Sequence, residues 1–134
     1  MKELYRGGCH CGVVRFECRL DPAEGTSRCN CSVCAKGRFW KAIARKEDFR
    51  ILQGEGDLGD YRFGSGTIHH LFCRHCGIKS FGRGSLQALG GTFYAVNVAC
   101  LDGTAPQEMA AGPIRYENGR DGNWGEAPDE TRHL

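Results

Sequence analysis

The sequence predicts a small, mainly β protein in which zinc holds small antiparallel sheets together. Three observations support this: short runs with a two-residue hydrophobic period, no window with a convincing 3.6-residue period, and closely spaced cysteines. The chain has 134 residues, which corresponds to one domain. We expect a domain over residues 1–118 and a polar, mobile tail over residues 119–134, with Trp124 exposed on the surface.

The clearest strand is predicted at residues 12–20, where alternate side chains share one apolar face: Val14, Phe16, Cys18 and Leu20. Residues 93–100 repeat this alternation. Shorter β-like runs follow one another at 39–45, 49–53, 60–63, 68–73 and 114–117, separated by turn residues. The whole pattern predicts about eight short strands. At most one helical turn is expected, near Lys46–Phe49 or Thr104–Met109.

The apolar core is thin, because Leu, Ile, Val and Phe make up only about a fifth of the chain. The chain begins without the apolar run of a signal peptide, and it lacks a stretch long enough to span a membrane. We therefore expect a cytoplasmic protein without membrane contact, in which paired cysteines bind metal and do not form disulfides. A net charge of +2 gives no support for nucleic-acid binding.

Seven of the nine cysteines form three groups. The first group is Cys9 and Cys11, the middle group is Cys29, Cys31 and Cys34, and the third group is Cys73 and Cys76. Two pairs add up to four thiolates, so the first and third groups predict one complete structural zinc site. Glycines beside them (Gly7, Gly8, Gly12 and Gly77) are expected to supply unusual backbone angles.

The middle group has three cysteines, one short of a closed tetrahedral site. Three protein ligands and an open position are typical of a catalytic zinc. The alternative is a second structural zinc completed by a residue from elsewhere: His69, His70, His75, Cys18 or Cys100. Because Cys18 and Cys100 lie on apolar strand faces, we expect them in the core. His69 and His70 are adjacent in a strand and should point in opposite directions.

Basic residues follow the middle group, beginning with Lys36 and Arg38. They are consistent with an ordinary solvated face. They also suit a carboxylate-bearing substrate next to an open zinc, and this hypothesis predicts that the Lys36→Ala/Arg38→Ala variant binds an anionic thiol more weakly without losing metal.

Four segments, GGCHCG, CNCSVC, FCRHCG and YAVNVACLDG, occur in this order between about residues 5 and 103. Together they resemble the family of glutathione-dependent formaldehyde-activating enzymes and centromere protein V. The resemblance implies a β-tent-like fold with two zinc ions, one structural at Cys9, Cys11, Cys73 and Cys76, and one catalytic at Cys29, Cys31 and Cys34. Asn30 and Ala35-Lys36 differ from the residues common in that family, but the cysteines match.

The activity implied by the resemblance is that of a carbon–sulfur lyase, which condenses formaldehyde with glutathione to S-hydroxymethylglutathione and reverses that reaction. The expected partners are therefore a small-molecule thiol and an aldehyde. Two alternatives remain open. One is a non-catalytic interaction module held together by zinc, with a fully ligated second ion. The other is a redox or iron-bearing Cys₄ protein, which would be coloured.

Overall fold

The computed structural model describes residues 1–134, and its ten strands and two short α-helices confirm the mainly β prediction. The strands are β1 (Glu3–Gly8), β2 (Arg15–Leu20), β3 (Thr26–Cys29), β4 (Trp40–Arg45), β5 (Phe49–Gln53), β6 (Leu58–Tyr61), β7 (His69–Cys73), β8 (Phe81–Leu86), β9 (Gly91–Asn97) and β10 (Ile114–Glu117). The helices are α1 (Ser32–Gly37) and α2 (Ala105–Ala110). Each has six residues, which is far too few to cross a bilayer.

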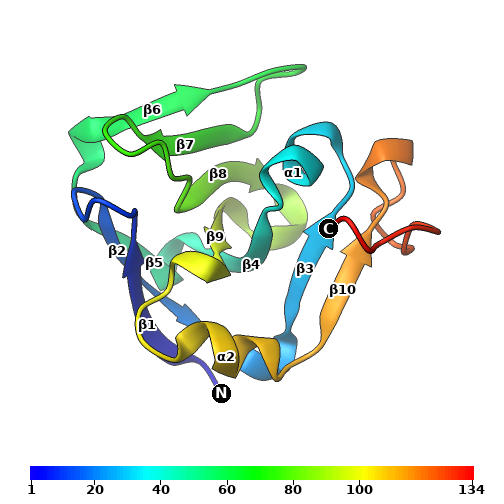
Figure 1. Ribbon diagram of the computed structural model, residues 1–134, viewed down its shortest axis with the longest axis horizontal. Coiled ribbons are helices and arrows are strands. Elements are labelled where there is room, and N and C mark those ends of the chain that lie inside the picture. The colour runs from blue at the N-terminus through cyan, green and yellow to red at the C-terminus, as the bar shows by residue number, and fades with distance from the viewer.

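The strands form two sheets (Figure 1). The smaller has the order β1-β2-β5 and the larger has the order β10-β3-β4-β9-β8-β7-β6. All neighbouring strands are antiparallel except β10 and β3, which run parallel. In Figure 1, the smaller sheet and α2 close one side of the molecule, while α1 lies at the far end of β3. The parallel pair is an exception to the expected antiparallel sheets, and it places the C-terminal strand beside the middle cysteine group.

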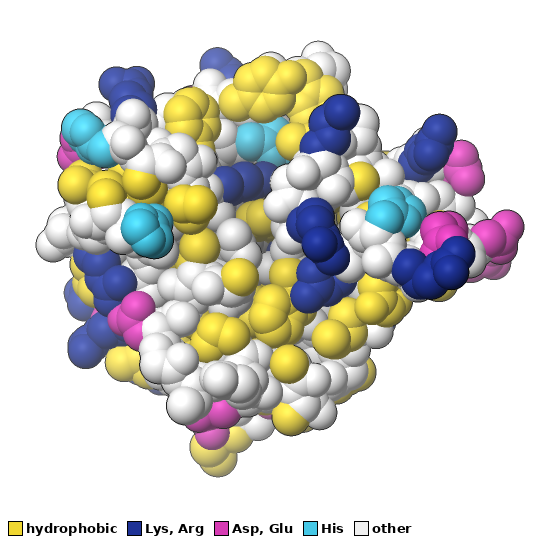
Figure 2. Space-filling model, viewed as in Figure 1, with side chains coloured by type: hydrophobic (Ala, Val, Ile, Leu, Met, Phe, Trp, Pro, Cys, Tyr) yellow, Lys and Arg dark blue, Asp and Glu magenta, His cyan; other side chains and the backbone are white.

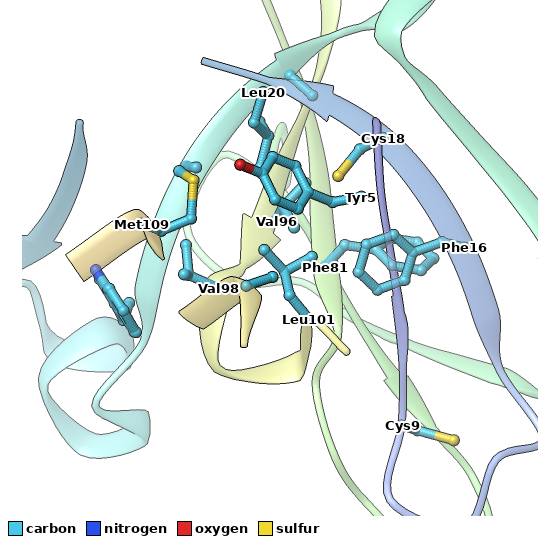
Figure 3. Packing of buried hydrophobic residues seen from close by; sticks show 14 of the residues in the cluster. Tyr5, Cys9, Phe16, Cys18, Leu20, Phe81, Val96, Val98, Leu101 and Met109 are labelled. Carbon is cyan, nitrogen blue, oxygen red and sulfur yellow. The ribbon is translucent and has the colours of Figure 1, made fainter. Parts of the chain in front are cut away.

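The core lies between the two sheets. Phe16 of β2 and Phe49 of β5 come from the smaller sheet, and their rings are stacked with centroids 5.4 Å apart. Phe49 also stacks on Tyr94 of β9, with a 4.0 Å separation, and Phe81 of β8 meets Phe16 edge to face. Figure 3 shows Phe16 and Phe81 beside each other, with Val96, Val98 and Met109 further along the same cluster. Aromatic contacts therefore join the two sheets.

Several sequence predictions are confirmed by burial. The predicted apolar face of the first strand is buried as expected, since Val14, Phe16, Cys18 and Leu20 are all at most 4% exposed. Trp124 is 58% exposed, as predicted.

Other predictions need correction. The run at 93–100 does not remain extended: β9 ends at Asn97, whose side chain accepts a hydrogen bond from the Ala99 amide and starts a 3-10 turn. Both candidate helical segments are helical, not one, because Lys46–Asp48 forms a 3-10 turn and Ala105–Ala110 forms α2. Strands β1, β3 and β8 and helix α1 were not predicted.

The strand β8 shows why such elements escape prediction. Gly82 and Gly84 make its sequence look like a turn. In the structure, a Cβ on Gly84 would lie 2.7 Å from the Phe93 ring and 2.6 Å from Ile68. The glycine therefore makes room for large side chains from neighbouring strands, which only the sheet register brings together.

Candidate functional site

The first and third cysteine groups come together at one place. The sulfur atoms of Cys9, Cys11, Cys73 and Cys76 all lie within 4.8 Å of one another. The Cys11 Sγ lies 3.6 Å from both the Cys9 Sγ and the Cys73 Sγ. None of these cysteines forms a disulfide. The predicted pairing of the two groups is therefore what the structure shows.

Turns at the ends of three strands position these sulfurs. Cys9 and Cys11 lie in the connection from β1 to β2, where a turn holds them. Cys73 ends β7, and a tight turn leads to Cys76, with the Gly77 amide donating to the Cys73 carbonyl at 2.8 Å. Gly12 and Gly77 adopt φ of 84° and 79°, as expected.

Gly7 and Gly8 do not have positive φ, so the expectation of unusual angles was wrong for them. Both lie in β1, where they allow close approach. A Cβ on Gly7 would lie 2.4 Å from the Cys100 carbonyl oxygen.

A zinc ion fits this donor set. Four sulfurs at about 2.3 Å from a tetrahedral zinc lie about 3.8 Å from one another, close to the 3.6 Å observed for two pairs. Backbone amides of Val14 and His75 donate to Cys9 Sγ and Cys73 Sγ at 3.3 and 3.4 Å. Backbone hydrogen bonds at Cys11 and Ile78 help lower the pKa of Cys76 to about 6, which favours a thiolate at neutral pH. One structural zinc site is thus supported by distances and by hydrogen bonding.

The middle group lies at the junction of β3 and α1. Cys29 is the last residue of β3, Cys31 directly precedes α1, and Cys34 lies within it. The Cys31 amide donates to Cys29 Sγ at 3.4 Å. Unlike the first site, this group does not bring three donor atoms within 4.8 Å of one another. The second zinc therefore remains a prediction.

Two lysines lie beside the middle group. Lys41 of β4 pairs with Glu117 of β10, and Lys79 follows the turn of the third cysteine group. A hydrogen bond from Cys31, together with the charges of both lysines, lowers the pKa of Cys34 to about 7. The surroundings of Cys34 therefore favour its thiolate, whereas a hydrogen bond with Cys31 and burial raise the pKa of Cys29. The face shown in Figure 2 carries Lys and Arg side chains near its centre, next to a histidine and hydrophobic side chains.

The segment after β10 packs against the middle group. Asn30 donates from Nδ2 to Asn118 Oδ1 at 2.9 Å and accepts at Oδ1 from the Arg120 amide, also at 2.9 Å. A Cβ on Gly119 would lie only 2.5 Å from Cys29 Sγ. Asn30 thus fixes the beginning of the predicted tail over the cysteines. The division at residue 118 and the mobility of the tail stay predictions.

The alternative ligands for the middle group have other contacts. His69 Nδ1 lies 2.7 Å from Asp60, and His75 Nε2 lies 2.8 Å from Asp57. His70 is buried, in contrast to the half-buried His69, and its Nδ1 lies 2.7 Å from Lys79 Nζ. Cys18 is in the core at 1% exposure, as predicted, whereas Cys100 is only partly buried.

Sequence reasoning did not identify Lys79 or Gly119 as neighbours of the middle group. Both are far from it along the chain, and neither is part of a spacing motif. Lys79 reaches the middle group because the turn at the third cysteine group leads from β7 into its neighbour β8. Gly119 reaches it because β10 pairs with β3.

Comparison with known proteins gives two results. The family model described as glutathione-dependent formaldehyde-activating enzyme matches residues 4–115. The solved crystal structure of a Rhodobacter sphaeroides protein is similar, with a TM-score of 0.69 and 36% sequence identity. That match covers 83% of this chain and 98% of the other. The family match includes all seven grouped cysteines.

Proposed function

The chain belongs to the glutathione-dependent formaldehyde-activating enzyme family, and from this premise we propose that it is a carbon–sulfur lyase that condenses a small aldehyde with a thiol such as glutathione. Family membership supports a formaldehyde-activating, glutathione-related function. With formaldehyde, the product would be S-hydroxymethylglutathione. The observation that carries the proposal is the middle cysteine group, which has three sulfur donors, two neighbouring lysines and no role in the structural site.

The two zinc ions would have different roles. Cys9, Cys11, Cys73 and Cys76 would hold a structural ion with no open position. Cys29, Cys31 and Cys34 would hold a second ion that leaves one position for substrate. When bound there, zinc supplies Lewis-acid chemistry, which keeps a substrate sulfur in its thiolate form near neutral pH.

Residues of the chain supply the rest of the site. Asn30 and the segment beginning at Gly119 cover Cys29, so this side of the group is fixed. The exposed side chains of Lys36 and Arg38 are at the other end of α1, where they suit the carboxylates of a glutathione-like thiol. The Lys36→Ala/Arg38→Ala variant should therefore bind glutathione more weakly with its zinc content unchanged.

Metal analysis and an exchange assay test the proposal together. The purified protein should contain two zinc ions per chain, one of which is removed more readily by a chelator. ¹³C exchange spectroscopy with labelled formaldehyde and glutathione should show interconversion with S-hydroxymethylglutathione faster than the uncatalysed rate. Cys31→Ser should abolish the acceleration, while Cys18→Ala, which changes a core cysteine outside both sites, should retain it.

A protein with two bound zinc ions that leaves the exchange at its uncatalysed rate would overturn the lyase proposal. Such a result would favour the non-catalytic zinc module. A coloured preparation that contains iron would favour the redox alternative.

A further inference from the structure

Lys79 stands out among the cations of this protein. It is half-buried, and no carboxylate lies within ion-pairing distance, whereas the nearby Lys41 is neutralised by Glu117. An ammonium group removed from water without an anion is costly. A half-buried cation without a carboxylate partner is therefore suited to pair with negative charge at the middle cysteine group or on a molecule bound there.

Three contacts fix the position of Lys79. Its Nζ lies 2.7 Å from His70 Nδ1 and 4.1 Å from the centre of the ring of Phe39, two residues after the end of α1. Its backbone carbonyl accepts a hydrogen bond from Asn97 Nδ2 at 2.9 Å. The ammonium group is thus held between a neutral acceptor and an aromatic face, and neither of these contacts neutralises its charge.

The histidine contact is itself fixed. His70 is only 8% exposed, and Phe63 stacks on its ring with centroids 5.4 Å apart and an interplanar angle of 22°. Burial, together with the charge of Lys79, lowers the pKa of His70 to about 4, so its ring is neutral near pH 7 and its Nδ1 accepts from the ammonium group. His70 is therefore a positioning residue for Lys79.

Phe39, whose ring lies against the Lys79 ammonium group, donates its backbone amide to the Cys34 carbonyl at 3.0 Å. Lys79 is thus next to the middle cysteine group, and its charge interacts with Cys31 and Cys34. These are two of the three residues that would hold the second zinc. The cation therefore lies beside the group that would bind the substrate thiol.

We propose that Lys79 is a catalytic residue that binds the aldehyde oxygen and stabilises the negative charge formed on it. This inference rests on the lyase function proposed above and identifies the group that completes its chemistry. Preorganised cations and hydrogen-bond donors aimed at a developing oxyanion are among the strongest sources of catalysis.

The thiol loses its proton to solvent on binding, and its sulfur lone pair forms the new carbon–sulfur bond. The carbonyl π pair moves to oxygen, which takes a proton from the Lys79 ammonium group. The resulting amine then regains a proton from water. In the reverse direction, the Lys79 amine removes the hydroxyl proton as the carbon–sulfur bond breaks.

Three variants test the role of the charge. Lys79→Met keeps most of the apolar stem without the charge, and it should lower kcat by about 10²- to 10³-fold with little change in KM for the thiol. Lys79→Arg keeps the charge and should recover part of the loss. Lys2→Met, which removes an exposed lysine that precedes β1 and pairs with Asp48, is the matched control and should behave as wild type.

His70 is tested through its acceptor atom. His70→Leu removes the acceptor and should lower kcat by about tenfold. His70→Gln retains an acceptor and should recover activity. If His70 had only a packing role, the apolar leucine would be tolerated at least as well as glutamine.

A second readout does not depend on catalysis. Formate is an unreactive one-carbon anion, and its binding to the zinc-loaded protein can be measured by calorimetry. Lys79→Met should weaken formate binding by at least tenfold, whereas Lys2→Met should not. Zinc content and Tm, measured on every variant, separate loss of the charge from loss of the fold.

The outcomes distinguish the two proposals. If wild type accelerates the exchange but folded, zinc-loaded Lys79→Met has the same kcat and binds formate equally well, the role of Lys79 is overturned and the lyase function stands. If wild type shows no acceleration, the lyase function fails, and formate binding alone then decides whether Lys79 is an anion site.

Discussion

Removing a single exposed thiol should destabilise the protein more than removing a buried one. Cys11 is exposed, so Cys11→Ala removes almost no packing. Its sulfur nevertheless belongs to the four-sulfur set that ties the β1–β2 connection to the end of β7. Cys18 has the opposite character, because it is 1% exposed and lies outside both cysteine sites. Comparison of Cys11→Ala with Cys18→Ala therefore separates the metal crosslink from apolar burial.

The magnitude follows from the length of chain that the crosslink closes. Cys11 and Cys73 are 62 positions apart. In the chain-entropy treatment of crosslinks, closing a loop of that length removes about 4 kcal/mol of entropy from the unfolded state. An unfolding entropy of about 2.1 cal/mol/K per residue turns this into a decrease in Tm of roughly 14 °C for this chain. The buried Cys18 thiol should contribute only about 1–2 kcal/mol.

Scanning calorimetry and metal analysis check this expectation. Cys11→Ala should bind one zinc fewer than wild type and unfold roughly 14 °C lower. Excess chelator should bring wild type down to a similar Tm while changing Cys11→Ala much less. Cys18→Ala should keep its zinc and lose only a few degrees. A larger loss for Cys18→Ala than for Cys11→Ala, with equal zinc in both, would refute the crosslink as a main source of stability.

Three further predictions concern single contacts. Gly119→Ala should weaken metal retention at the middle group in a chelator competition, because its Cβ would lie 2.5 Å from Cys29 Sγ. A Cβ at Gly37 would meet nothing within 4 Å, so Gly37→Ala is the control and should retain the metal. Equal metal retention in the two variants would contradict the predicted clash. Thr26→Val should cost about 1–3 kcal/mol in urea unfolding, because the buried indole that donates to the Thr26 hydroxyl at 2.7 Å loses its acceptor. Thr26→Ser keeps that acceptor and should cost less. His70 has a pKa lowered to about 4, so its ring stays neutral in the folded state while the unfolded chain takes up a proton below about pH 6.5. Stability should therefore fall as pH is lowered from about 6.5 toward 4, His70→Gln should reduce that slope, and an NMR titration of the ring near pH 6.5 would contradict the reasoning.

The spacing of residues along the chain predicted structure correctly where similar side chains recur within a few positions. The first predicted strand has its apolar face buried because alternation places Val14, Phe16, Cys18 and Leu20 on one side whatever the rest of the fold does. The structural zinc set was predictable for a similar reason. Close cysteine pairs that form no disulfide have few uses, and two such pairs supply the four thiolates that zinc requires.

Sequence-based prediction failed where a helix or strand is short, or where its residues are determined by contacts with segments distant in the chain. Helix α1 has only six residues, too few to show a hydrophobic period. Strand β8 contains glycines that are needed because side chains of other strands lie close to them. Gly84, for example, lies against the ring of Phe93. The end of β9 at Asn97 depends on a side-chain cap, a signal that alternation of apolar residues does not contain.

The sequence by itself determined the mainly β class, the four cysteines that come together in one cluster suited to zinc, and the family. These depend on residue types at short spacing, which are visible in the chain. Only the tertiary structure decided that Lys79 and Gly119 lie beside the middle cysteine group and that His70 contacts Lys79. They reach it through strand pairing between distant segments, and the energy of a half-buried charge depends on neighbours that spacing along the chain does not specify.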